Sequence, residues 1–89
     1  MALIKVSSSS RTSSVAGAIA GVIRENNYAE VQAIGAGAVN QAVKALILAT
    51  KYLKQDGIAV FMIPQFADVT INEKVKTAIK LIIESSKVS

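Results

Sequence analysis

The residues best suited to chemistry form one short run, Gly35-Ala36-Gly37-Ala38-Val39-Asn40-Gln41-Ala42-Val43-Lys44. The run follows an alternating segment typical of a strand and opens a segment with helical spacing. Backbone N–H groups at the start of a helix, together with the helix dipole, favour an anion there. The run therefore indicates either a phosphate site or a tight turn in which the glycines reverse the chain, and spacing alone favours the turn.

This run does not match the known nucleotide fingerprints. Asn40 stands where a dinucleotide motif has its third glycine, no acidic residue is suitably placed after the next strand, and the lysine arrangement of a P-loop is missing. A nucleotide-dependent enzyme is therefore disfavoured.

Composition narrows the chemistry further. The 89 residues include no Cys and no His, which excludes thiolate or imidazole metal sites, disulfides, Cys nucleophiles and Ser-His-Asp triads. We expect no metal, no cofactor and no enzymatic activity. Ten Lys and Arg against six Asp and Glu give a net charge of +4, which favours polyanionic partners.

The first half of the chain predicts two strands separated by a helix. Residues 2–6 form a short strand with Ile4 and Val6 inward and Lys5 outward, and the serine-rich stretch 7–14 supplies a hydroxyl to cap the helix that follows. That helix is defined by Val15, Ile19, Val22 and Ile23, and an asparagine at 26–27 suits a left-handed end. Gly17 and Gly21 share one helix face, so we expect close packing there.

The second half predicts a strand at 28–34, half-buried, and a helix from Val39 to Leu53. Residues 58–63 are apolar on both faces until Pro64, which predicts the most buried strand, ended by the proline. Residues 65–74 are expected to form a hairpin loop, and the alternation over 75–84 a fourth strand.

The element order is therefore β-α-β-α-β-β, a two-layer α/β sandwich of one domain, 1–89, with an ordered core of about residues 2–84. Strands joined through helices should pair in parallel, with both helices on one sheet face. The other face carries Lys5, Glu30, Gln32, Lys76, Lys80 and Glu84, a mixture that favours a solvated surface over a binding groove. No segment is apolar enough to span a bilayer, so we expect a cytoplasmic protein without membrane contact.

Four segments closely resemble the stage V sporulation protein S family: residues 3–7, 14–22, 32–45 and 77–81. The resemblance covers about residues 3–84, and its most specific part is the run Ala33-Ile34-Gly35-Ala36-Gly37-Ala38-Val39-Asn40-Gln41-Ala42-Val43-Lys44. It implies a small cytoplasmic regulator associated with spore development.

The element order with its glycine-containing turn also resembles the Alba family of dimeric chromatin and RNA-binding proteins. That resemblance implies the strand order 1-2-4-3 with the fourth strand antiparallel, and nucleic acid meeting the first loop, the second helix's first turn and a long basic hairpin. The positions that match the first loop and the beginning of the second helix are Ser8, Ser9, Ser10, Arg11, Gly35, Gly37, Asn40 and Lys44. The hairpin departs from the pattern, since Asp68 and Glu73 offset Lys74.

Two functions from different classes follow. The first is a DNA- or RNA-binding regulator, with Arg11 and Lys44 contacting phosphates at the same end of the molecule. The second is a protein-interaction module without direct nucleic-acid binding. Surplus apolar residues at Ile47, Leu48 and Phe61 predict a homodimer interface, although the sheet and loops of a monomer could equally cover them.

Overall fold

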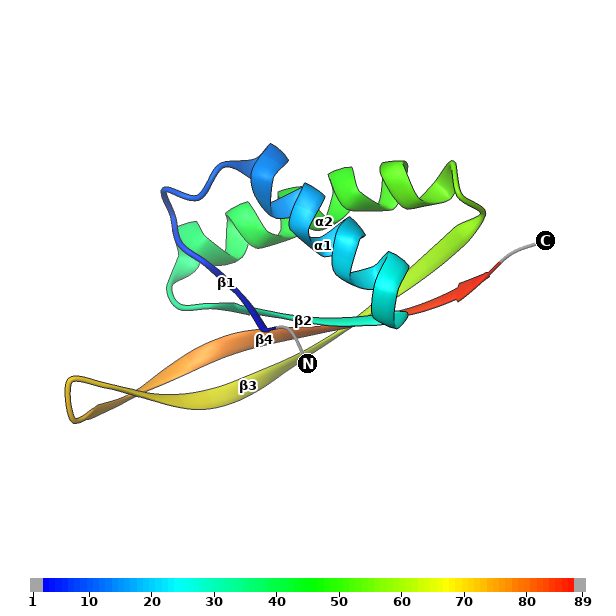
Figure 1. The fold of residues 1–89 in the computed structure, drawn as a ribbon. Coiled ribbons are helices and arrows are strands. Elements are labelled where there is room, and N and C mark those ends of the chain that lie inside the picture. Colours follow the sequence, from blue (N-terminus) through cyan, green and yellow to red (C-terminus); the bar gives the residue numbers. More distant parts are fainter. Residues whose placement is uncertain (1–2, 88–89) are drawn as a thin grey trace.

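The computed structural model describes residues 3–87, which form a helical layer on one face of a four-stranded sheet (Figure 1). The elements are β1 (Leu3–Val6), α1 (Thr12–Asn26), β2 (Tyr28–Ala33), α2 (Ala36–Lys54), β3 (Ile58–Ile71) and β4 (Lys74–Lys87). The sheet order is β1-β2-β4-β3, with β1 parallel to β2 and the other neighbours antiparallel. The predicted element order, strand order and layering are confirmed; Ala2, placed in the first strand from sequence, lies outside the described residues.

The two central strands alternate as their sequences predict. Ala29, Val31 and Ala33 of β2 are at most 2% exposed, whereas the residues between them are half-buried on the other face. On β4, Leu81 and Ile83 pair with β2 and are buried beneath the helices. These two strands therefore form the side of the hydrophobic core that faces the helices.

The helices bury mostly alanine. Nine alanines are 3% exposed or less, and six of them lie on the helices: Ala16, Ala20, Ala38, Ala42, Ala45 and Ala49. Because a methyl group is a small spacer, α1 and α2 pack closely on each other and on the sheet. Ile19, Ile23 and Leu53 supply the bulk that fills the remaining space, each with 0% exposure.

The helix ends agree only in part with expectation. Asn27 closes α1 in the left-handed conformation at φ 62°, with its N–H donating to the Ile23 carbonyl over 2.8 Å, as predicted. The hydroxyl cap at the start of α1 was wrong: the N-cap is Arg11, and no side chain caps this fully described helix. The second helix begins at Ala36 rather than Val39, because Gly35 adopts φ 93° and completes the reversal alone.

The glycines of α1 do not mark a close approach. A Cβ at Gly17 or Gly21 would meet no heavy atom within 4 Å among residues 3–87, so the expected close packing is absent from this chain. Gly37 is the glycine at which another segment approaches closely.

The third strand departs most from expectation. It passes through Pro64 and continues to Ile71. β3 lies at the sheet edge, where one side of the strand has no neighbour and a missing N–H removes no ladder bond on that side. For the same reason it is the least covered strand, not the most buried: every residue of β3 is half-buried or exposed.

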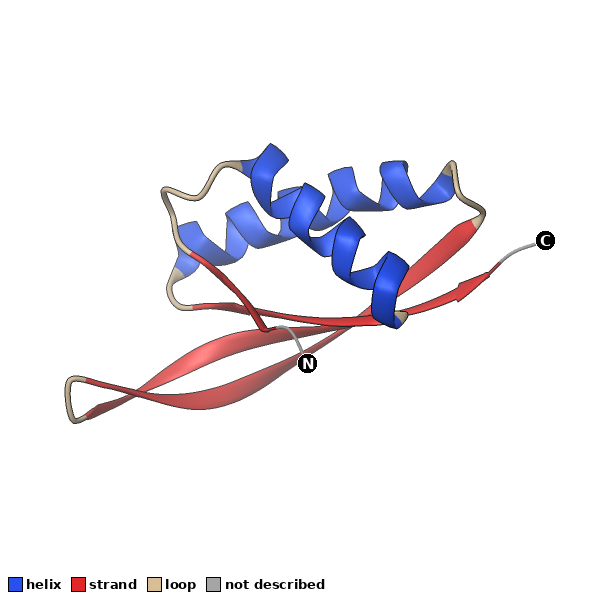
Figure 2. Cartoon of the chain, in the orientation of Figure 1, coloured by secondary structure: helices blue, strands red, loops and turns tan. Residues whose placement is uncertain are grey.

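The expected loop at 65–74 is instead a hairpin. β3 and β4 pair continuously from Ile58 with Lys87 to Ile71 with Lys74, and only Asn72 and Glu73 turn the chain, at φ 51° and 65°. Two consecutive positive φ angles are typical of the tight turn that matches strand twist. The hairpin extends past the helical layer, which gives the molecule dimensions of 47 × 21 × 17 Å (Figure 2).

The open space around Gly17 leads to a stability prediction. Gly17→Ala should raise the free energy of unfolding by about 1 kcal/mol, because alanine is the better helix former and its methyl group meets nothing. Gly35→Ala is the matched control and should lower it by about 1 to 3 kcal/mol, since φ 93° strains any side chain. Urea denaturation measures both. A destabilised Gly17→Ala would mean that this helix face is covered in solution.

Candidate nucleic-acid interface

Parallel pairing brings two chain reversals to one end of the molecule. β1 and β2 lie side by side with Val6 opposite Ala33, so the loop 7–11 and the turn at 34–35 leave the sheet together (Figure 1). Each reversal leads directly into a helix. The N-termini of α1 and α2 therefore lie at this end, as the sequence predicted.

A side chain of α2 fixes the two reversals to each other. Gln41 donates from Nε2 to the Ser10 carbonyl over 2.8 Å, and the same nitrogen lies 3.4 Å from Thr12 Oγ1. Both bonds are partly buried. Because these acceptors flank Arg11, the second turn of α2 holds the position of that residue's backbone.

A close approach completes the contact between the reversals. A Cβ at Gly37 would lie 3.0 Å from the Ser8 Cβ, so a side chain at residue 37 would force the serine loop to shift by a few tenths of an ångström. The sequence identified Gly37 from the resemblance, and the structure supplies this physical reason for it.

The serine loop also bonds within itself. The Ser7 N–H donates to Ser10 Oγ over 2.9 Å, and the Ser10 N–H donates to the Ser7 carbonyl over 3.1 Å. The Ser7 and Ser9 hydroxyls are 3.1 Å apart, and Ser9 is exposed. The loop is thus a preformed turn in which Ser10 is structural and Ser9 faces solvent.

The surface at this end is positive. Neither helix, each described from end to end, has an acidic residue in its first turn or a side-chain cap at its start. Arg11 is exposed at the start of α1. Asn40 and Lys44 are exposed one helical turn apart on α2, so they share a side of that helix. Uncapped N–H groups and two cations that take part in no ion pair within residues 3–87 together suit an anion.

A groove lies beside this positive end and includes residues that sequence analysis did not assign to the site. Its volume is about 380 Å³, and it is lined by Lys5, Val6, Ser7, Ser8, Gln32, Ile34, Val69, Thr70 and Ile71. The contribution of β3 was missed because residues 65–74 were interpreted as a loop. Lys5 and Gln32 were placed on a solvated face, where alternation alone gave no sign of a concave surface.

The three residues predicted at a homodimer interface lie on different sides. Ile47 is 56% exposed on α2. Leu48 is partly buried against the core, and it lies two turns after Gln41 on the side of α2 that faces α1. Phe61 is 58% exposed and pairs with Glu84, which places it on the helix-free face.

The helix-free face carries a separate polar cluster. Tyr28 donates from its hydroxyl to Glu30 over 2.6 Å, and Lys80 Nζ lies 3.2 Å from the other carboxylate oxygen of Glu30. The bond from Tyr28, followed by the one from Lys80, lowers the pKa of Glu30, and the bond to Glu30 raises the pKa of Tyr28. All the groups are paired, so this cluster stabilises the sheet rather than offering an open site.

Residues 2–86 match the family model described as stage V sporulation protein S. The chain belongs to this family. It is accordingly a small sporulation-associated protein, as its sequence motifs indicated. No helix within residues 3–87 is long and apolar enough to cross a membrane.

Among solved structures, the chain is similar to Alba from Thermoplasma volcanium. The TM-score is 0.63 at 15% sequence identity, and the match covers 97% of this chain and all of that one. At this identity the likeness establishes a shared fold. The hairpin of this chain carries charges of both signs, since exposed Asp68 and Glu73 stand against Lys74 and Lys76.

The polar cluster on the helix-free face predicts a pH dependence. The pKa of Glu30 is lower in the folded chain than its usual value of 4.5, so its stabilising effect is complete above that value and is lost as pH falls through the folded pKa. Glu30→Gln should therefore be less stable than the natural protein near neutral pH, and the difference should shrink below pH 4.5. Urea denaturation across this range measures it, with Glu25→Gln on exposed α1 as the control. A difference that is independent of pH would contradict the assignment.

Proposed function

We propose that this protein binds nucleic acid through the phosphate backbone, at the end formed by the serine loop and the first turns of α2. One observation carries the proposal. Gln41 bonds the two reversals to each other, and Gly37 lets them approach closely. The end that they form presents two uncapped helix N-termini together with the side chains of Arg11 and Lys44. Phosphate contacts from backbone N–H groups, Arg and Lys position a protein on nucleic acid without reading its sequence.

The aromatic residues support backbone contact over base stacking. Tyr28 is bonded to Glu30, and Tyr52 is packed against the core. Phe61 and Phe66 are exposed on the edge strand β3, but neither lines the groove beside the serine loop. Stacking platforms for single strands need aromatic rings beside the charged surface. The phosphate backbone, shared by DNA and RNA, is therefore the proposed ligand.

The proposed role is that of a cytoplasmic regulator of spore development that acts by binding and not by catalysis. Its family places it among sporulation proteins. The groups at the positive end are cations, amides and hydroxyls, which can bind an anion but include no base to activate a nucleophile.

A homodimer is the proposed working form. Its support is the exposed apolar side chains on α2 and on both faces of β3, where Ile47, Phe61, Met62, Ile63 and Phe66 are 40% to 77% exposed. Apolar area of this kind marks interfaces. The same surface supports the second candidate function, a protein-interaction module, in which the positive end would be incidental.

A salt titration tests binding. The affinity for a DNA or RNA duplex should fall as salt rises, with a slope of log K against log salt of about −3 to −4 if four phosphates are neutralised. Replacing Arg11 and Lys44 together by alanine should weaken binding and reduce that slope by about two per protomer, because each side chain neutralises one phosphate. Fluorescence anisotropy measures both quantities.

The matched control removes two cations from the opposite end, Lys51→Ala with Lys87→Ala, where both side chains are exposed. It has the same net charge as the double variant and should keep the salt slope. If the two double variants lose affinity equally, the binding is non-specific attraction to net charge. If the natural protein binds neither nucleic acid at low salt, the interaction-module function is favoured.

A further inference from the structure

The helix-free side of the sheet forms one wall of the groove beside the serine loop. Lys5 and Gln32 lie next to each other on that side, since they are paired in register and both line the groove. Ile34 follows Gln32 by two residues and lines the groove with it. This isoleucine lies outside the hydrophobic core, so its side chain remains available to a ligand.

The hairpin supplies the opposite wall. Because β2 ends at Ala33, opposite Ile79, the part of the hairpin nearer its turn has no neighbour in β2. Strand twist rotates this part relative to the rest of the sheet (Figure 1). Its residues Val69, Thr70 and Ile71 line the groove. The groove therefore lies between the end of the β1–β2 pair and the far part of the hairpin.

The polar side chains of the groove include two without a partner. Within residues 3–87, half-buried Gln32 makes no side-chain hydrogen bond. Lys5 is exposed and takes part in neither ion pair of the same residues. The apolar side chains around them belong to Ile34, Val69 and Ile71. Apolar walls with a few convergent polar groups are typical of a ligand site.

The size and position of the groove limit what it can hold. Its volume of about 380 Å³ is near the lower end of the roughly 300 to 1,000 Å³ of ligand pockets, which suits one nucleobase with its sugar. Ser7 and Ser8 line the groove and belong to the serine loop, and Ser8 lies against Gly37 at the start of α2. The groove is thus continuous with the proposed phosphate-binding end.

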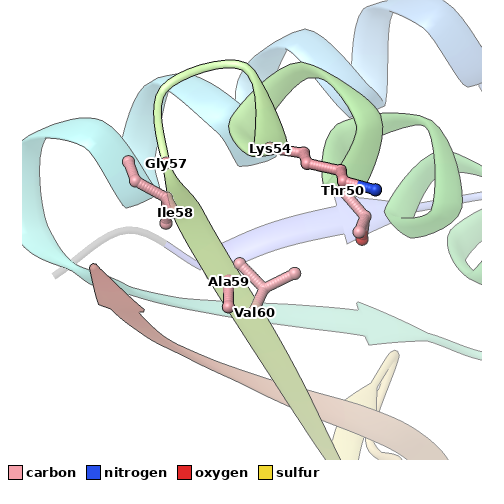
Figure 3. A pocket seen from close by; sticks show the side chains of 6 residues that line it. All are labelled: Thr50, Lys54, Gly57, Ile58, Ala59 and Val60. Atoms are coloured by element: carbon pink, nitrogen blue, oxygen red, sulfur yellow. The ribbon is translucent and has the colours of Figure 1, made fainter. Parts of the chain in front are cut away.

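A second hollow lies too far away to share a ligand with that end. It has a volume of about 450 Å³ and lies between the last turns of α2 and the beginning of β3, with Thr50, Lys54 and Val60 in its lining (Figure 3). At a rise of about 1.5 Å per residue, Thr50 lies about 20 Å along α2 from Ala36. A nucleotide whose phosphate lies at the first turn of α2 would reach the groove and not this hollow.

From this arrangement we propose that the groove receives one unpaired base of a bound DNA or RNA, while the adjoining phosphates lie at the positive end. The inference rests on the proposed function and adds a base-contacting site to it. Bases within a regular duplex are stacked and paired, so only a base in a bulge, a loop or a single strand can enter.

Each wall of the groove has a role in this contact. The aliphatic side chains of Ile34 and Val69 would lie against the base, in place of the aromatic platform that stacking needs. The Gln32 amide offers both a donor and an acceptor to the edge of the base. Lys5 adds a cation for the neighbouring phosphate. The natural ligand would then be an irregular nucleic acid rather than a uniform duplex.

A nucleic-acid hairpin with one bulged adenosine tests this inference. Adenine is the probe because a glutamine amide can bond its N6 and N7 atoms together. The matched ligand is the same hairpin with an abasic bulge, which has identical phosphates. The natural protein should bind the bulged adenosine about five- to tenfold more tightly, because the base adds a hydrogen bond and an apolar contact. Fluorescence anisotropy with RNA and DNA versions shows which of the two nucleic acids supplies the base.

Gln32→Leu tests the groove itself. The variant lacks the amide but keeps a side chain of similar size, so it should lose most of the preference for the base and keep its affinity for the abasic bulge. Gln65→Leu is the matched control. Gln65 is exposed and, like Gln32, pairs with Lys80, but it does not line the groove. Circular dichroism checks that both variants are folded.

Methyl resonances provide an independent measurement. The ring of a base in the groove should shift the methyl signals of Ile34, Val69 and Ile71 when the bulged adenosine binds, whereas the abasic bulge should not. Ile63 is the control, because it is exposed on the same face of β3 as Val69 and lies outside the groove.

Equal affinity for the adenosine and the abasic bulge, in both RNA and DNA, overturns the base site and leaves backbone binding in place. A preference that survives Gln32→Leu without the methyl shifts puts the base elsewhere and also overturns it. Equally strong methyl shifts with adenosine monophosphate alone would make the groove a site for a free nucleotide instead. A natural protein that binds none of these hairpins at low salt overturns the proposed function as well.

Discussion

The parallel pairing of β1 with β2 is the constraint on which the candidate site depends. Because β1 and β2 run parallel, the loop after β1 and the turn after β2 leave the sheet at the same end, and each leads into a helix that starts there. Gln41 then fixes the two reversals relative to each other, because its side-chain amide donates a hydrogen bond from α2 to the Ser10 carbonyl of the serine loop. Arg11 and Lys44 inherit their relative placement from this contact and not from any contact with each other.

The alanine core serves the same arrangement. Because the buried faces of α1 and α2 consist largely of methyl groups, the helices lie close enough for a glutamine of one to reach the loop before the other. Larger side chains at Ala38 or Ala42 would push the first half of α2 away from the serine loop. At the surface, the lack of a side chain at Gly37 likewise allows close packing, because even a methyl group there would contact Ser8.

The sequence predicted an element correctly where the element's own pattern of apolar and polar residues decides which of its faces is buried. The strict alternation of β2 and the apolar spacing of α1 predicted their buried faces correctly, and the motif over residues 33–44 identified the family. On α2 the apolar spacing was right only in part, since Thr50 is exposed and Ala38 and Ala45 are buried. The burial of β3 was predicted wrongly. Apolar residues on both faces show that a strand has few polar side chains, but they do not show how many other strands or helices cover it. The strand order leaves β3 at the edge, so Pro64 is tolerated and Phe61, Met62 and Phe66 remain exposed. The groove beside Lys5 was missed because residues 69–71, which line it, were interpreted as part of a loop.

Mapping of backbone amide shifts during titration with a nucleic-acid duplex tests the central claim most directly, because it reports each segment of the chain separately. We expect the amides of residues 8–12 and 35–40 to shift together with one saturation curve, while those of residues 51–57 at the opposite end remain unchanged. Shifts confined to β3, or spread evenly over all exposed lysines, would contradict the account.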